Sequence, residues 1–128
     1  MLVRDAMSTV VLTVGPTHTL REAARQMSAR GVGAAVVLDG TADGVGILTE
    51  RDILHAVGGG QDVDAERVGD HLTTELVFAT PEMTLEEAAA LMTRGQFRHL
   101  IVLDGGEVAG VVSVRDIVRL WAGAAVRG

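Results

Sequence analysis

The sequence has no cysteine, no lysine and no apolar run long enough to cross a bilayer. Without cysteine the chain can form no disulfide, no thiolate nucleophile and no thiolate metal site, as fits a reducing compartment. The longest apolar runs, such as residues 34–38, fall far short of the roughly 20 residues that a membrane-spanning helix needs. We therefore expect a cytoplasmic protein that does not enter a membrane.

The absence of lysine means that all 11 basic residues are arginines, and they are outnumbered by 17 acidic residues to give a net charge of −6. A chain of this sign has no general attraction for nucleic acid or for an anionic membrane surface. We therefore expect no nucleic-acid partner, and any bound anion must be held by a local basic site. Arginine suits that purpose because its planar fork of donors matches a phosphate.

Residues that could carry out catalysis or hold a metal are also missing from the pattern. The four histidines, at 18, 55, 71 and 99, show no i, i+4 spacing, so we expect no metal site. The sequence contains neither a nucleophile elbow nor a phosphate-binding loop of the nucleotide hydrolases, and no paired carboxylates in a setting that would separate their pKa values. We therefore predict that the protein is not an enzyme and needs no cofactor.

What the sequence does contain is an internal repeat. Residues from Val3 onward match those from Val68 onward at an offset of 65, which becomes 64 after a one-residue deletion. Residues 37–40 (Val-Leu-Asp-Gly) thereby match residues 102–105, and residues 51–53 (Arg-Asp-Ile) match 115–117. A unit of about 60 residues buries too little surface to be stable alone, so the two copies should form one body.

Both repeats have the same expected order of elements, strand–helix–strand–strand–helix. Thr19 and Thr84 begin the first helices as N-caps, each with a glutamate three residues later, which is the pattern of a capping box. The expected turns between the paired strands are Asp39-Gly40 and residues 104–106, and residues 58–60 (Gly-Gly-Gly) read as a linker. We predict strands at 10–14, 34–38, 45–48, 76–79, 100–103 and 108–112, and closing helices at about 49–57 and 113–121.

This tandem β-α-β-β-α repeat, with Gly-apolar-x-Thr/Ser-x-x-Asp before each closing helix, resembles the CBS domain pair, or Bateman module. The resemblance covers about Val3 to Trp121. It implies an α/β (α+β) fold of two units, 1–60 and 61–128, related by a pseudo-twofold axis, with small sheets packed against helices. It further implies a cleft between the units that in many members holds an adenosine-containing ligand, and a homodimer.

The segments 46–52 and 110–116 carry the functional hypothesis. Thr49 with Asp52, and Ser113 with Asp116, have the spacing of an N-cap and its N3 partner, which caps a helix whatever else it does. A helix N-terminus also attracts a phosphate, which can bond the capping hydroxyl, whereas the carboxylate suits the hydroxyls of a ribose. Both helix capping alone and nucleotide binding therefore remain open, and in the resembling family these positions contact ribose and phosphate.

The resemblance also implies that the two pockets differ. Arg98-His99 precede a strand of the second repeat, where many ligand-binding members carry basic residues that contact phosphate; the alternative is a pair of solvated strand-end charges. Gly33-Ala34 stand at the equivalent place in the first repeat. One implied pocket combines Ser113, Asp116, Arg98 and His99 with the wall residues Leu12, Val32 and Gly33, and the other combines Thr49 and Asp52 with the wall residues Val77 and Phe97.

Two functions follow. The first is a sensor that binds AMP, ADP, ATP or a related adenosyl compound and acts on a target protein that the sequence does not identify. The second is an assembly module that dimerises with its cleft empty. For both, we expect a homodimer through the closing helices, which carry Ile53-Leu54 and the apolar residues of 117–121, including Trp121.

Overall fold

The computed structural model describes residues 1–38 and 44–127, of which 124–127 are described by their backbone alone. The chain forms two compact units. The Thr49 unit consists of Leu12–Leu76, and the Ser113 unit combines Met1–Val11 with Val77–Gly128. Each unit has its own three-stranded sheet and its own core, so the mixed α+β class expected from the sequence is confirmed.

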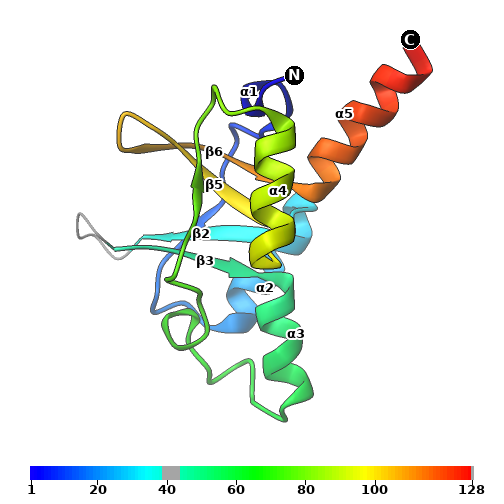
Figure 1. The fold of residues 1–128 in the computed structure, drawn as a ribbon. Helices are drawn as coiled ribbons and strands as arrows, with labels where there is room; N and C mark the ends of the chain where they lie inside the picture. The colour runs from blue at the N-terminus through cyan, green and yellow to red at the C-terminus, as the bar shows by residue number, and fades with distance from the viewer. Residues whose placement is uncertain (39–43, 128) are drawn as a thin grey trace. The chain divides into compact units, whose positions relative to one another are not determined.

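In the Thr49 unit, β1 runs parallel to β2, and β2 pairs with β3 in the antiparallel sense, in the sheet order β1-β2-β3. Alternate strand residues such as Ala35, Val37 and Leu48 pack with Leu20 and Met27 of the first helix into one buried cluster. The helix and the strands thus direct their apolar faces toward the same core. The elements are β1 (Thr13–Val14), α2 (Leu20–Arg30), β2 (Ala34–Leu38), β3 (Val45–Thr49), α3 (Glu50–Gly58) and the 3₁₀ turn η1 (Val68–Asp70) (Figure 1).

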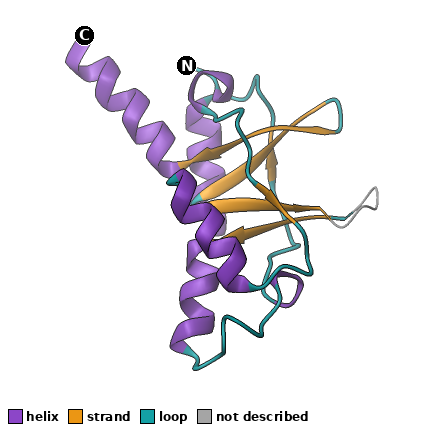
Figure 2. Cartoon of the chain, turned by 180° about the vertical axis from the view of Figure 1, so that it is seen from behind, coloured by secondary structure: helices purple, strands orange, loops and turns teal. Residues whose placement is uncertain are grey.

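The Ser113 unit repeats this arrangement. Its sheet has the order β4-β5-β6, again with one parallel and one antiparallel pair. Leu100, Val102 and Val112 of the sheet share a buried cluster with Leu85 and Met92 of the helix. The elements are α1 (Val3–Ala6), β4 (Phe78–Ala79), α4 (Leu85–Gly95), β5 (His99–Asp104), β6 (Glu107–Ser113) and α5 (Val114–Arg127) (Figures 1 and 2).

The segment that begins each repeat, residues 1–11 in the first and 61–76 in the second, packs into the compact unit that is built mainly from the other repeat. We call these two the exchanged leading segments. In the Ser113 unit, Ser8 and Val111 exchange two backbone hydrogen bonds of 2.9 and 3.0 Å. In the Thr49 unit, Thr73 and Ile47 do the same, at 2.9 and 3.0 Å. The boundaries 1–60 and 61–128 therefore describe sequence repeats, whereas the compact units divide the chain at residues 11–12 and 76–77.

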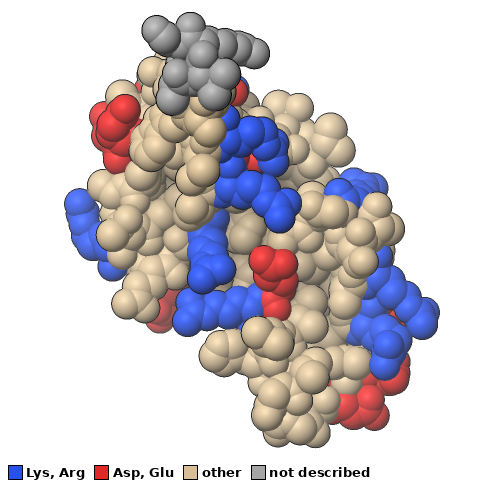
Figure 3. Space-filling model, turned by 90° about the vertical axis from the view of Figure 1, so that its right-hand side faces the viewer, with Lys and Arg blue, Asp and Glu red and all other residues tan. Residues whose placement is uncertain are grey.

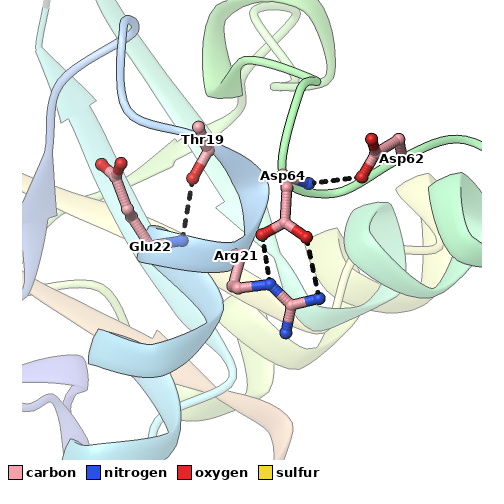
Figure 4. Close-up of polar contacts among 5 residues, drawn as sticks. All are labelled: Thr19, Arg21, Glu22, Asp62 and Asp64. Carbon is pink, nitrogen blue, oxygen red and sulfur yellow. Dashed lines mark hydrogen bonds and ion pairs between the residues drawn. The ribbon is translucent and has the colours of Figure 1, made fainter.

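The same leading segments complete the N-termini of α2 and α4. The Leu20 N–H donates to the Glu66 carbonyl at 3.0 Å, and the equivalent Leu85 N–H donates to the Met1 carbonyl at 3.2 Å. The first N–H groups of a helix have no partner within it, so these carbonyls satisfy donors that would otherwise need water. Thr19 accepts from the Glu22 N–H at 3.1 Å, which confirms the expected N-cap (Figure 4). Among the described contacts, neither Glu22 nor Glu87 makes the return bond of the expected capping box, which α3 does have.

An ion pair links α2 to the segment that precedes η1, residues 61–67. The Arg21 guanidinium donates to both carboxylate oxygens of Asp64, one of these bonds measuring 3.2 Å, and the Asp64 N–H donates to Asp62 (Figure 4). The hydrogen bond from Arg21 holds the pKa of Asp64 below its usual range, and the same bond raises the pKa of Arg21. The residue equivalent to Arg21 in the second repeat is Glu86, which cannot form the same ion pair with a carboxylate.

The boundaries of the expected elements differ from the structure at the short strands and at the ends of the closing helices. The last helix, α5, runs to Arg127 instead of ending at about Trp121, and Gly58, expected in a linker, is the last residue of α3. The runs 10–14 and 76–79 form strands of only two residues, because only Thr13–Val14 and Phe78–Ala79 find a partner in the sheet. The turn between Asp104 and Glu107 is the expected hairpin, with Gly105 and Gly106 both at positive φ. The other expected turn, Asp39-Gly40, lies outside the described residues.

The closing helices begin where their N-caps predict, at Glu50 and Val114. Within residues 1–38 and 44–127, none of the helices combines the length and the hydropathy that a bilayer crossing requires.

Candidate functional site

The N-terminus of α5 is closed by a full reciprocal cap. The Ser113 N–H donates to Asp116 Oδ2 at 2.8 Å, and the Asp116 N–H donates to Ser113 Oγ at 3.1 Å. Both side chains are half-buried. The cap leaves Asp116 Oδ1 outside the reciprocal pair, so one carboxylate oxygen remains to accept a further donor.

The sheet brings Arg98 and His99 beside this cap. His99 pairs with Ser113 in the β5–β6 register, and the Val114 N–H donates to the Arg98 carbonyl at 2.9 Å. Arg98 is exposed and His99 is half-buried. The four residues that the sequence assigned to this site (Arg98, His99, Ser113 and Asp116) therefore lie together at the junction of β5, β6 and α5; we call them the Ser113 site.

The Thr49 site, consisting of Thr49 and Asp52 with Gly33-Ala34 beside them, has the same backbone. Ala34 pairs with Thr49 in the β2–β3 register, and the Glu50 N–H donates to the Gly33 carbonyl at 2.9 Å. The Thr49 N–H donates to Asp52 Oδ2 at 2.8 Å, and the Asp52 N–H donates to Thr49 Oγ1 at 3.2 Å. The repeat in the sequence is therefore also a repeat of the site geometry.

The two caps differ in how their hydroxyl and carboxylate groups are engaged. Thr49 Oγ1 donates to Asp52 Oδ2 at 3.0 Å, so its proton is already used. In the part of the chain that the structure describes, the Ser113 hydroxyl donates to no such acceptor. The Ser113 site thus keeps a donor that the Thr49 site has used within its own cap.

Arg119 is a further neighbour of the Ser113 site, and the sequence motif does not indicate it. Its Nη1 lies 3.8 Å from Asp116 Oδ1, and the side chains of Arg119 and Asp116 are 69% and 17% exposed. Helical side chains lean toward the N-terminus, so an arginine at i+3 reaches back to the carboxylate. This spacing was the available signal, and the equivalent residue in the first repeat is His55.

The motif glycines have a structural task. A Cβ on Gly110 would lie 2.5 Å from the Ser8 carbonyl oxygen, because the exchanged leading segment runs directly beside β6. A Cβ on Gly46 would meet the Leu72 side chain at 2.7 Å and the Thr73 carbonyl oxygen at 3.2 Å. The two glycines therefore allow the close approach of the exchanged backbone.

The residues proposed as pocket walls lie in different environments. Leu12 belongs to the buried core of the Thr49 unit, and Phe97 packs against the core of the Ser113 unit. Val32 and Val77 are exposed, and Gly33 is half-buried. Because each implied pocket combines residues of both units, the joint role of these residues stays a prediction.

Charge on the surface is mixed. Figure 3 shows arginine and carboxylate side chains on the same face, as the composition of 11 basic and 17 acidic residues leads one to expect. Among the described residues, no group of three or more His, Asp or Glu side chains is arranged to hold a metal ion.

Comparison with models of known protein families assigns both repeats to one family. The model of the CBS domain matches residues 3–59 and 68–123, which are the two repeats. The chain belongs to the CBS domain family. It is a CBS pair, a type of regulatory module, and the resemblance read from the sequence is confirmed.

Relatives of similar size support the assignment. The CBS domain-containing protein YhcV of Bacillus subtilis is 40% identical over 118 residues, which make up 90% of this chain and 81% of the relative. A protein with CBS domains from Burkholderia ambifaria MC40-6 has a TM-score of 0.89 at 32% identity, covering 96% of this chain and 95% of that chain.

A more distant CBS pair shows the fold alone. The CBS domain pair of protein MJ0100 has a TM-score of 0.86 at 24% identity, covering 97% of this chain and 98% of that chain. Its structure was determined in complex with 5′-methylthioadenosine and S-adenosyl-L-methionine.

Proposed function

We propose that this CBS pair is a regulatory sensor of an adenine nucleotide or a related adenosyl ligand, with the Ser113 site as its stronger binding site. The observation that carries the proposal is the grouping of Arg98, Ser113 and Asp116 at one helix N-terminus. In the proposed mode, the ribose hydroxyls donate to Asp116, and the phosphate accepts from Ser113 and Arg98. Binding of the ligand would shift the module toward the conformation that a target protein recognises. This mode of regulation needs no covalent step.

The chemistry of each group fits its proposed partner. Asp116 Oδ1 lies outside the reciprocal cap and accepts donors, whereas a phosphate beside it would be repelled. The α5 N-terminus has the positive end of the helix dipole, and Arg98 adds a full positive charge next to it. The MJ0100 pair supports the class of ligand, since a protein of this fold was solved with two adenosyl compounds.

A thermal-shift panel tests the proposal. We expect AMP, ADP, ATP or S-adenosylmethionine to raise the melting temperature of the chain, and GTP to do so least. A ligand at 100 times its dissociation constant stabilises the folded state by about 2.7 kcal/mol, which is readily measured in a domain of this size. A panel in which no adenosyl compound raises the melting temperature at millimolar concentration contradicts the proposal.

We expect the bound nucleotide to remain intact. In the part of the chain that the structure describes, no cluster of His, Asp or Glu side chains is arranged to hold the metal ion that phosphoryl transfer usually needs, so we expect the barrier to hydrolysis to stay high. The measurement is release of phosphate from ATP by the purified protein. Turnover that disappears in the Asp52→Ala or Asp116→Ala variant would show that a catalytic site exists.

Apolar side chains on the closing helices favour a second candidate function, a ligand-free assembly module. Val114, Val118 and Trp121 follow each other at i, i+4 and i+7 on α5 and are exposed, as are Leu54 and Val57 on α3. Ile117 is buried in the core, so part of the surface that the sequence assigned to an interface instead stabilises the Ser113 unit. The remaining stripe is the kind of apolar surface that contacts a partner.

We therefore predict a homodimer in solution. Light scattering at micromolar concentration should give about twice the 13.4 kDa mass of one chain. Val118→Glu should lower that mass because it places a charge in the stripe, whereas Val10→Glu, at a valine that is 73% exposed and lies outside the helices, should leave it unchanged. A mass of one chain for the unmodified protein contradicts the prediction.

A further inference from the structure

The two sites provide an internal comparison, because they share a backbone and differ in a few charges. Arg51 and Asp52 have identical counterparts in Arg115 and Asp116, so these residues do not distinguish the sites. At the caps and at the residues that contact them, three changes of charge make the Thr49 site more negative than the Ser113 site. The changes are Glu50 for Val114, His55 for Arg119, and Gly33-Ala34 for Arg98-His99.

Glu50 is the change that directly follows the capping residue Thr49 in the chain. It is the first residue of α3, directly after the Thr49 cap, and its side chain is exposed. An acidic side chain in the first turn stabilises a helix in the absence of a ligand. A phosphate at the same helix end would meet that carboxylate as a like charge, whereas Val114 presents no charge to a phosphate at the start of α5.

The Thr49 hydroxyl adds a second obstacle to phosphate. Its proton already bonds Asp52 Oδ2 at 3.0 Å, so donation to a phosphate oxygen would break a bond within the cap. The Ser113 hydroxyl has no equivalent bond to Asp116 in the described part of the chain. The hydroxyls of a ribose, in contrast, need only an acceptor, and Asp52 still offers Oδ1.

We infer that the Thr49 site takes an adenosyl ligand whose 5′ substituent carries no phosphate, and that Glu50 is the residue that selects against phosphate there. This inference rests on the proposed function and deepens it. The module would then bind two classes of adenosyl compound at the same time, a phosphorylated one at the Ser113 site and an unphosphorylated one at the Thr49 site.

Backbone amide resonances of the intact chain can test each site separately. The Thr49 and Ser113 N–H groups donate to the two aspartates, so they report on each carboxylate when AMP or adenosine is titrated. We expect the ratio of the AMP to the adenosine dissociation constant to exceed one at Thr49 and to fall below one at Ser113. Glu50→Val should lower the ratio at Thr49 by about two- to fivefold, the size of one charge at a helix N-terminus, and leave Ser113 unchanged.

Three further variants complete the design. The reciprocal Val114→Glu should raise the ratio at Ser113, and Val118→Glu, which places a charge further along the same apolar stripe of α5, serves as the control for any change in the dimer. Glu86→Val, which removes an exposed carboxylate from the first turn of α4 outside both sites, should change neither ratio. If AMP and adenosine shift neither amide, the proposed function fails and this inference fails with it. If both ligands bind but the ratio is equal at the two sites, or Glu50→Val leaves it unchanged at Thr49, this inference alone is overturned.

Discussion

Replacing Arg98 with alanine is expected to weaken the binding of AMP or ATP by about ten- to a hundredfold and to leave adenosine binding nearly unchanged. A charge-assisted hydrogen bond contributes about 1.5–3 kcal/mol, and 1.4 kcal/mol corresponds to a factor of ten in affinity. Arg98 is exposed, and its carbonyl accepts from the first residue of α5, so the substitution removes the guanidinium without disturbing the core. Adenosine lacks the phosphate and therefore does not use this charge.

Asp116→Ala provides the contrasting result, because the proposed partner of Asp116 is the ribose that nucleotide and nucleoside share. We expect calorimetry to show a similar loss for AMP and adenosine in this variant. Arg94→Ala, at an exposed arginine in the last turn of α4, serves as the matched control and should bind like the unmodified chain. If Arg98→Ala binds ATP like the unmodified chain, or Asp52→Ala is more harmful than Asp116→Ala, then the Ser113 site is not the stronger one.

Gly110→Ala is expected to destabilise the fold by about 1–3 kcal/mol, the usual cost of forcing an extra carbon into a packed region. The added Cβ would lie 2.5 Å from the Ser8 carbonyl oxygen and 3.2 Å from the Met7 sulfur. The obstacle is the carbonyl oxygen of a residue whose backbone makes two hydrogen bonds to Val111, so it cannot move aside like a flexible side chain. Chemical denaturation of the unmodified and variant proteins measures the loss.

Two other glycines serve as controls for this prediction. Gly58 is the last residue of α3, and a Cβ added there would have nothing within 4 Å, so this position should tolerate alanine or gain stability. Gly46→Ala should be milder than Gly110→Ala, because the nearest obstacle is the end of the Leu72 side chain. An unchanged midpoint for Gly110→Ala would show that the exchanged segment does not pack tightly against β6.

Much of the fold could be predicted because the two sequence repeats show the same pattern of caps, turns and apolar residues. Thr19 and Thr84 predicted helix starts that the structure confirms, since an N-cap and its first-turn glutamate form a local pattern that depends on no distant residue. The same locality explains why Thr49 with Asp52, and Ser113 with Asp116, could be paired from spacing alone.

The features that the sequence did not predict depend on contacts between distant residues. Ser8 and Val111 meet because a leading segment packs beside the other repeat, and neither the period nor the composition of residues 1–11 indicates where that segment goes. The pair of Arg21 with Asp64 depends on the same exchange. Ile117 could not be assigned to the core or to an interface from helical period alone, because both choices place an apolar residue on one face.

The central claim is that the Ser113 site binds phosphorylated adenosine, and a crystal structure of the unmodified chain grown with AMP tests it most directly. We predict density for AMP at the N-terminus of α5, with both ribose hydroxyls within hydrogen-bond distance of Asp116 and the phosphate against Ser113 and Arg98. An empty Ser113 site at saturating AMP, or a nucleotide bound with its phosphate away from Arg98, would contradict the claim.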